Sequence, residues 1–170
     1  GDVYKRQVNA ESDGKYSEYY KAFYYLNRGV LRAEMIDFIS SIENNVQTLT
    51  MDDKGTTRAR VRDQVSRTYD YSEAIDDMLA ADRLLPGVPY IYFNLGNLYC
   101  LSSKFVESVD SYTKAINVYP YMGDAYFNRG LVLIYLKDKE KGCIDLSRAG
   151  ELGVSDAYSV ISKYCEEEKN

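Results

Sequence analysis

The sequence contains no histidine and no tryptophan among its 170 residues. Histidine is the usual general base and the commonest metal ligand, so its absence excludes the Ser-His and Cys-His arrangements of nucleophilic catalysis. The glycine-rich loops that bind phosphate groups, G-x-G-x-x-G and G-x-x-x-x-G-K-[ST], are absent as well. We therefore expect no enzymatic activity, no cofactor and no metal site.

Two pairs of adjacent aspartates, Asp52-Asp53 and Asp76-Asp77, are the remaining candidates for acid chemistry. The first pair comes shortly before a glycine, which is typical of a turn. We interpret the second pair as a solvated helix face. Neither pair therefore predicts a catalytic or metal-binding site.

Cysteine is scarce: Cys100, Cys143 and Cys165 are an odd number and include no C-x-x-C pair. This spacing indicates neither a disulfide framework nor a zinc site. We interpret all three as small buried hydrophobic residues. The cysteines therefore leave the cellular compartment open.

Positive charge is also limited, because 21 lysines and arginines stand against 26 acidic residues and give a net charge of −5. The longest basic cluster runs only from Arg58 to Arg62, so the surface that would neutralise nucleic-acid phosphates is missing. No apolar run approaches the roughly 20 residues that cross a bilayer. We expect neither a nucleic-acid partner nor a membrane span.

Residues 1–7 show no periodicity and are set aside as an artefact of cloning. Gly1 resembles the remnant of a cleaved tag, and the next six residues resemble a translated sequencing adapter. We therefore expect the natural start of the gene product to be missing from this sequence.

What the sequence does contain is a repeat with a period of 34 residues. The residues that recur at this spacing are Tyr92, Asn94 and Gly96 with Tyr126, Asn128 and Gly130, then Ala81 with Ala115 and Ala149, and Pro86 with Pro120. The chain has only 3 prolines and 11 glycines, and this scarcity of helix-breaking residues permits long helices. The pattern predicts helix pairs that repeat along the chain.

Small and large residues alternate within each repeat in a way that explains how its two helices pack. Gly96 and Gly130 let two antiparallel helices approach closely, and Tyr112 and Leu146 fill the space beside them. Pro120 ends the second helix, because proline lacks an amide hydrogen. Each pair leaves one apolar side that the next pair covers, so we expect a solenoid of stacked pairs.

This spacing resembles the signature of the tetratricopeptide-repeat (TPR) family. The matching residues are Tyr92-x-x-Leu95-Gly96-x-x-Tyr99, then Ser108-x-x-x-Tyr112, Ala115 and Pro120. The resemblance covers residues 71–154 and implies an all-α fragment of a bacterial TPR protein. It departs at Arg129, where leucine is usual, at Gly142 in place of alanine, and at Val154 in place of proline.

The expected domain layout follows from the repeat. The TPR domain occupies 8–154, with an interrupted repeat over about 22–88 and regular repeats at 89–122 and 123–154. Residues 155–170 form a cap helix and a polar tail, with Asp156 as the N-cap. The inward stripe of the cap helix is Ala157, Val160, Ile161 and Tyr164.

An insertion at about 38–68 separates the two helices of the first repeat. Its threonine-rich and valine-rich stretches flank an aspartate-rich turn that closes on Gly55, which predicts a small β-hairpin. Residues 39–49 also carry apolar side chains at helical spacing. We favour a first helix that runs past Phe38 and is followed by the hairpin.

The TPR resemblance implies that the first helix of each repeat lines a concave face that binds a peptide or partner protein. The predicted binding residues are Asn27, Tyr90, Phe93, Asn94, Asn97, Leu101, Phe127, Asn128, Leu131 and Tyr135. Three of them, Asn27, Asn94 and Asn128, share one repeat position, where an amide both donates to and accepts from a peptide backbone. The alternative is that these asparagines only solvate the helices and the aromatic residues belong to the core.

One TPR subtype clamps a carboxylate with lysine and arginine, but this chain has Phe93, Asp124 and Phe127 at those positions. An apolar or aromatic partner segment is therefore expected. The resemblance predicts a protein-protein interaction module that is a monomer or weak homo-oligomer. The alternative is a self-associating structural protein that uses the hairpin or the first helix as its interface. The partner, pathway and compartment stay open.

Overall fold

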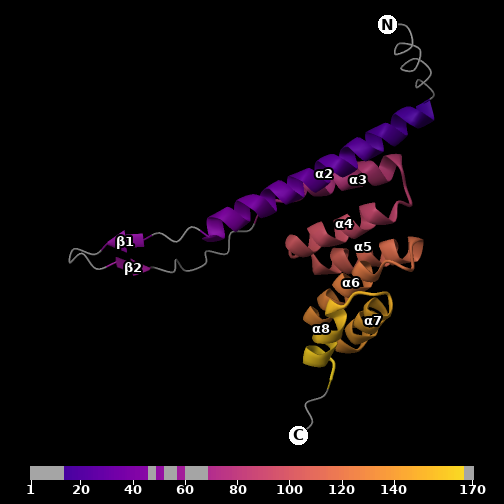
Figure 1. Ribbon diagram of the computed structural model, residues 1–170. Helices are drawn as coiled ribbons and strands as arrows, with labels where there is room; N and C mark the ends of the chain where they lie inside the picture. Colours follow the sequence, from indigo (N-terminus) through magenta and orange to yellow (C-terminus); the bar gives the residue numbers. More distant parts are fainter. Residues whose placement is uncertain (1–13, 46–48, 52–56, 60–68, 167–170) are drawn as a thin grey trace.

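The computed structural model describes residues 14–45, 49–51, 57–59 and 69–166, and its helices stack in chain order (Figure 1). The helices of these residues are α2 (Gly14–Asn45), α3 (Ser72–Leu84), α4 (Pro89–Leu101), α5 (Phe105–Val118), α6 (Gly123–Tyr135), α7 (Lys139–Glu151) and α8 (Asp156–Tyr164). No helix in this part of the chain has both the length and the apolar character that crossing a membrane requires. Residues 1–7, which were predicted to be an artefact of cloning, lie outside the described residues.

Three helix pairs, α2 with α3, α4 with α5 and α6 with α7, form the body of the stack, and α8 closes its C-terminal end (Figure 1). The predicted solenoid of helix pairs is therefore confirmed. Pro89 is the first residue of α4, where its missing amide hydrogen costs nothing and its fixed φ suits a helix start. Pro120 follows α5 and prevents its continuation.

The turn between the two helices of a repeat is itself repeated. Ser103 and Lys137, one period apart, both adopt a positive φ, of 58° and 70°. The next residue then donates its amide back to the end of the first helix, from Lys104 to the carbonyl of Tyr99 at 2.8 Å and from Asp138 to that of Leu133 at 2.9 Å. This bond satisfies a carbonyl that the helix end would otherwise leave unpaired.

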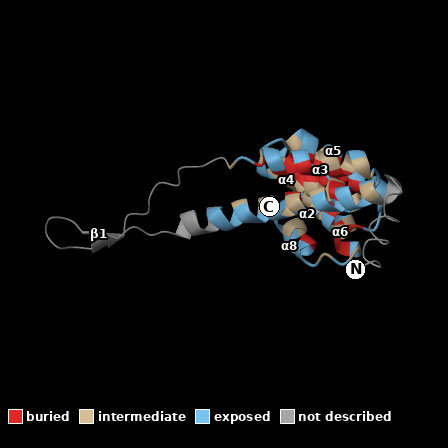
Figure 2. Cartoon of the chain, turned by 90° about the horizontal axis from the view of Figure 1, so that it is seen from above, coloured by how far each residue is buried: buried red, intermediate tan, exposed pale blue. Residues whose placement is uncertain are grey.

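The predicted pairs of small and large residues hold each repeat together. A Cβ atom built on Gly96 would overlap the Tyr112 ring, and one built on Gly130 would lie 3.1 Å from Leu146 Cγ. The first repeat uses the same device, since a Cβ on Gly29 would lie 2.9 Å from Met78 Cε. Figure 2 shows the buried residues gathered inside the helical stack, whereas residues 30–39 of α2 include none. The glycines therefore set the distance between paired helices.

The α2 helix runs past Phe38, as expected, and continues to Asn45, so a helix occupies the first part of the segment predicted as an insertion. Beyond it, strand β1 (Leu49–Met51) pairs antiparallel with β2 (Thr57–Ala59). The two strands lie past the end of α2, away from the stack (Figure 1). The predicted turn with Asp52-Asp53 lies outside the described residues.

The cap helix differs from its prediction in two details. Ser155, not Asp156, occupies the N-cap position, and Asp156 is the first helical residue, where its charge complements the helix dipole. Ala157 is buried and Val160 and Ile161 are half-buried, but Tyr164 is exposed rather than inward. A helix of only nine residues that packs on one neighbour buries a single narrow stripe.

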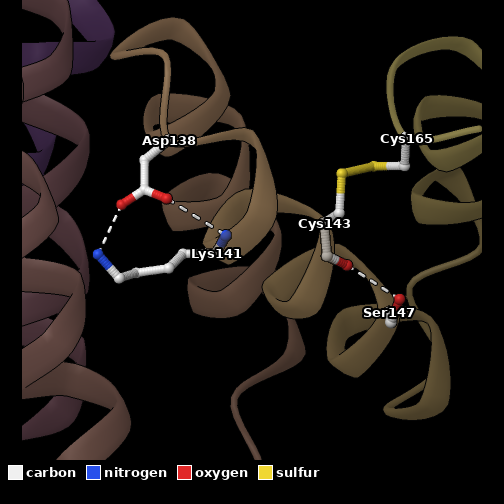
Figure 3. Close-up of a disulfide and its surroundings, with 5 residues drawn as sticks. All are labelled: Asp138, Lys141, Cys143, Ser147 and Cys165. Carbon is white, nitrogen blue, oxygen red and sulfur yellow. Dashed lines mark hydrogen bonds and ion pairs between the residues drawn. A yellow bond between two sulfur atoms is a disulfide. The ribbon is translucent and has the colours of Figure 1, made fainter. Parts of the chain in front are cut away.

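The interpretation of the cysteines is wrong. Cys143 of α7 and Cys165, directly after α8, form a disulfide with a Cα–Cα distance of 5.8 Å across 22 residues (Figure 3). None of the three cysteines is fully buried. Cys100 is a free, half-buried thiol whose pKa is raised by burial. The pairing arises from the way α8 folds back onto α7, a contact that sequence spacing alone did not reveal.

Candidate functional site

The first helices of two successive repeats are linked by a hydrogen bond between predicted site residues. The side-chain amide of Asn128 on α6 donates to the Asn97 carbonyl oxygen on α4 at 3.0 Å. The Tyr112 hydroxyl donates to the same oxygen at 2.6 Å. Asn97 and Asn128 therefore help to fix the spacing of α4 and α6, and the Asn97 acceptor is already occupied.

The other two asparagines are differently placed. Asn94 is half-buried and Asn27 is exposed, and neither side chain has a hydrogen-bond partner within the described residues. An amide without a partner keeps its donors and its acceptor available for a bound peptide backbone. The three asparagines that share a repeat position thus have different surroundings, and among the described residues only the Asn128 side chain has a hydrogen-bond partner.

The apolar members of the predicted site are divided between surface and core. Tyr90, Leu101, Leu131 and Tyr135 are exposed, whereas Phe93 and Phe127 are half-buried. Phe93 packs against a buried cluster of α5 and α6, and the centre of its ring lies 6.0 Å from that of Tyr112. The exposed residues therefore offer contact area, and the half-buried ones support the surface from beneath.

A hollow of about 450 Å³ opens where α4, the α5–α6 loop and the α7–α8 loop meet. Its aromatic and acidic lining consists of Tyr90, Phe93, Tyr119, Tyr121, Asp124 and Asp156. Residues 152–155 of the α7–α8 loop close one side. The rings of Tyr119 and Tyr121 have centroids 6.1 Å apart. The hollow is large enough for one long side chain.

Only two of the predicted binding residues, Tyr90 and Phe93, line this hollow. The loop residues of the hollow were not predicted, because the TPR resemblance implies binding positions only on the first helix of each repeat. The run Tyr119-Pro120-Tyr121 was a usable signal. Two tyrosines that flank a helix-ending proline stay at the surface of a loop, and tyrosine is enriched at binding surfaces.

The described residues also contain a charged network between α2 and α3. Asp77 is buried and accepts from Arg28 Nε at 2.9 Å and from Arg32 at 2.5 Å. The hydrogen bond from Arg28, assisted by Arg32, lowers the pKa of Asp77 despite its burial. The interpretation of Asp76-Asp77 as a solvated face is therefore wrong for Asp77, although Asp76 is exposed.

No family model matches the chain. A curated UDP-N-acetylglucosamine--peptide N-acetylglucosaminyltransferase of Giardia intestinalis is 28% identical over 86 residues, which are 51% of this chain and 6% of that protein. The chain thus corresponds to a small fraction of that relative's length.

A solved structure is also similar to the chain. It is the first TPR of Spaghetti (RPAP3) bound to the HSP90 peptide SRMEEVD. The match has a TM-score of 0.53 and 24% sequence identity, and it covers 55% of this chain and 75% of that chain.

Proposed function

We propose that this solenoid of helix pairs is a tetratricopeptide-repeat module that binds an extended segment of a partner protein along the first helices of its repeats. The observation that carries the proposal is the set of exposed apolar side chains on α4 and α6, which are Tyr90, Leu101, Leu131 and Tyr135. Tyr90 also lines the hollow. Large apolar residues that gather on one surface are typical of binding sites. The proposal assigns no catalytic step to this surface.

The similar TPR structure supports this kind of ligand, because that protein is bound to a seven-letter peptide, SRMEEVD. The unpaired amide of Asn94 supports it as well, since a peptide backbone needs both donors and acceptors. Asn27 extends the same surface onto α2. We therefore propose that Asn97 and Asn128 position the helices and that the other predicted binding residues contact the ligand.

A peptide library displayed on phage and selected on the immobilised chain tests this function. We expect enriched peptides whose affinity falls about tenfold in the double variant Tyr90→Ala/Leu131→Ala, because both side chains are exposed contact area. The matched control is Val106→Ala/Ile144→Ala, which removes two exposed apolar residues from α5 and α7. Equal losses in both variants would show that the peptides do not use the proposed face.

A second candidate function is self-association through α2. Tyr24 and Leu31 are 57% and 62% exposed. The residues at the same repeat positions of α4, Ile91 and Leu98, are 1% and 2% exposed because α3 covers them. The corresponding face of α2 therefore lacks the covering helix that α4 has.

A second copy of the chain could cover this face, and the paired strands β1 and β2, proposed as a hairpin insertion in the first repeat, would offer a further surface. Light scattering over a range of concentrations tests this candidate. It predicts a dimer that Leu31→Glu converts to a monomer. A wild-type chain that stays monomeric at high concentration would exclude it.

A further inference from the structure

The hollow beside Tyr90 combines aromatic rings with carboxylates. Tyr90, Tyr119 and Tyr121 are all exposed enough for their rings to meet a ligand, and Asp124 and Asp156 stand at its edge. Among the described residues that line the hollow, none is a lysine or an arginine. The faces of aromatic rings carry partial negative charge, so the ring faces and the two carboxylates both favour a cation.

The carboxylates of Asp124 and Asp156 are exposed and line the hollow without a cationic partner from the described residues. By contrast, Asp77 is paired with Arg28, Asp145 with Arg129, and Asp138 with Lys141. Neither Asp124 nor Asp156 has an ion pair or a side-chain hydrogen bond in the part of the chain that the structure describes. Their charge is thus free to act on whatever enters the hollow.

Both aspartates also lie in the first turn of a helix, Asp124 in α6 and Asp156 in α8. The amino end of a helix carries about half a positive charge. Two full negative charges exceed these two partial positive charges, so the hollow keeps a net negative field of about one charge. The net charge of −5 of the whole chain acts in the same direction.

We propose that this hollow receives a positively charged side chain, a lysine or an arginine, of the bound segment. This inference rests on the proposed function and adds the charge of its ligand. The cation lies over the rings of Tyr90, Tyr119 or Tyr121 and is neutralised by Asp124 and Asp156. Leu101, Leu131 and Tyr135 are outside the hollow and contact apolar parts of the same segment. The expected ligand is therefore a basic and apolar peptide.

Nuclear magnetic resonance titration of the ¹⁵N-labelled chain tests the proposal with three small probes. The probes are acetyl-Gly-Ser-Arg-Ser-Gly-amide and the same peptide with citrulline or with glutamate in place of arginine. Citrulline keeps the shape of arginine and removes its charge. The amides of Gly123 and Gly153, which line the hollow, are the reporters, and those of Gly29 and Gly142, which lie between paired helices, are the controls.

We expect the arginine peptide to shift Gly123 and Gly153, with an affinity about fivefold or more above that of the citrulline peptide. The double variant Asp124→Asn/Asp156→Asn should reduce the affinity for arginine to that for citrulline. Asp110→Asn, an exposed change on α5 outside the hollow, should leave it unchanged. Thermal unfolding of each variant confirms that the fold is intact.

Each other outcome overturns the inference in a recognisable way. Equal binding of arginine and citrulline would mean that the hollow does not recognise charge. Stronger binding of the glutamate peptide would mean that the helix amino ends, rather than the aspartates, dominate the field. The absence of shifts with every probe would remove the hollow as a site. The phage-selected peptides test the wider face separately, so these results do not by themselves refute the proposed function.

Discussion

Arg129 and Asp145 form a two-pronged ion pair that joins the two helices of the last repeat. Arg129 Nε lies 2.7 Å from Asp145 Oδ2, and Nη2 lies 2.8 Å from Oδ1. The remaining nitrogen, Nη1, donates to Thr113 Oγ1 of α5 at 2.9 Å. One guanidinium group therefore ties α6 both to its partner helix and to the preceding repeat.

The first repeat places Arg28 and Asp77 at the same two positions, whereas the middle repeat has Leu95 and Ser111 there. Where the first position is arginine, the second is aspartate, and where the first is leucine, the second is serine. The two positions change together because a buried charge is costly unless its partner is present. The departure from the tetratricopeptide-repeat signature at Arg129 is thus explained by Asp145.

The pair should behave as a unit in mutagenesis. Asp145→Ser leaves the largely buried Arg129 charge without its partner and should lower the free energy of unfolding by about 3 kcal/mol. Adding Arg129→Leu, which recreates the middle repeat, should recover most of this loss. Urea unfolding of the single and double variants measures both values. A double variant as unstable as the sum of its single changes would contradict this account.

Low pH should lower the free energy of unfolding of the chain partly through the protonation of Asp77. Because Arg28 and Arg32 lower its pKa in the folded state, the unfolded chain takes up the proton first as the pH falls. The stabilisation is complete above the unfolded pKa of about 4 and is lost as the pH drops from there towards the folded value.

The change Asp77→Asn should therefore lower stability at neutral pH and flatten its decline below about pH 4. Urea unfolding at several pH values compares this variant with the exposed neighbour Asp76→Asn. The two variants would show the same acid dependence only if Asp77 did not titrate differently on folding.

The disulfide should hold α8 against α7. Its removal by Cys143→Ser/Cys165→Ser, which opens a loop of 22 residues, should cost about 3 kcal/mol and speed hydrogen exchange of the α8 amides. Cys100→Ser is the control. A thiol assay on the unfolded, unreduced chain should find one reactive cysteine, and after reduction all three. Three reactive thiols before reduction would show that the bond does not form.

The close approach of α4 and α5 depends on Gly96. Gly96→Ala should destabilise the chain by about 1–2 kcal/mol, because the new methyl group meets the buried Tyr112 ring and this outweighs the better helix propensity of alanine. The same change in a Tyr112→Leu background should cost much less, since leucine leaves room beside the methyl group. Calorimetric unfolding of the four combinations gives the coupling. Equal costs in both backgrounds would rule out the contact.

The helix pairs and their register were predictable because a contact within each pair recurs at a fixed spacing. Gly96 with Tyr112 and Gly130 with Leu146 are examples, since each copy confirms the other. The Cys143–Cys165 bond occurs once and depends on how α8 packs on α7, so no repeated spacing in the sequence indicated it. The partner of Asp77 lies on α2, beyond an interruption of the repeat, which hid the pair from the same reasoning.

The candidate site was predictable only along the helices. Tyr90 and Phe93 were predicted because the resemblance to tetratricopeptide repeats implies binding positions on the first helix of each repeat. Tyr119, Tyr121 and the α7–α8 loop were missed, because the hollow forms where two inter-repeat loops meet the start of α4, and that meeting depends on the stacking of the repeats. The bond between Asn97 and Asn128 was likewise a consequence of stacking.

Site-specific photo-crosslinking tests the central proposal most directly. A photoreactive amino acid is placed at Tyr90 or Tyr135 on the proposed face, and at Val106 or Ile144 on the second helices, all four being exposed positions. With a phage-selected peptide, we predict crosslinks from Tyr90 and Tyr135 and none from Val106 and Ile144. Crosslinks confined to Val106 and Ile144 would contradict the assignment of the binding face to the first helices.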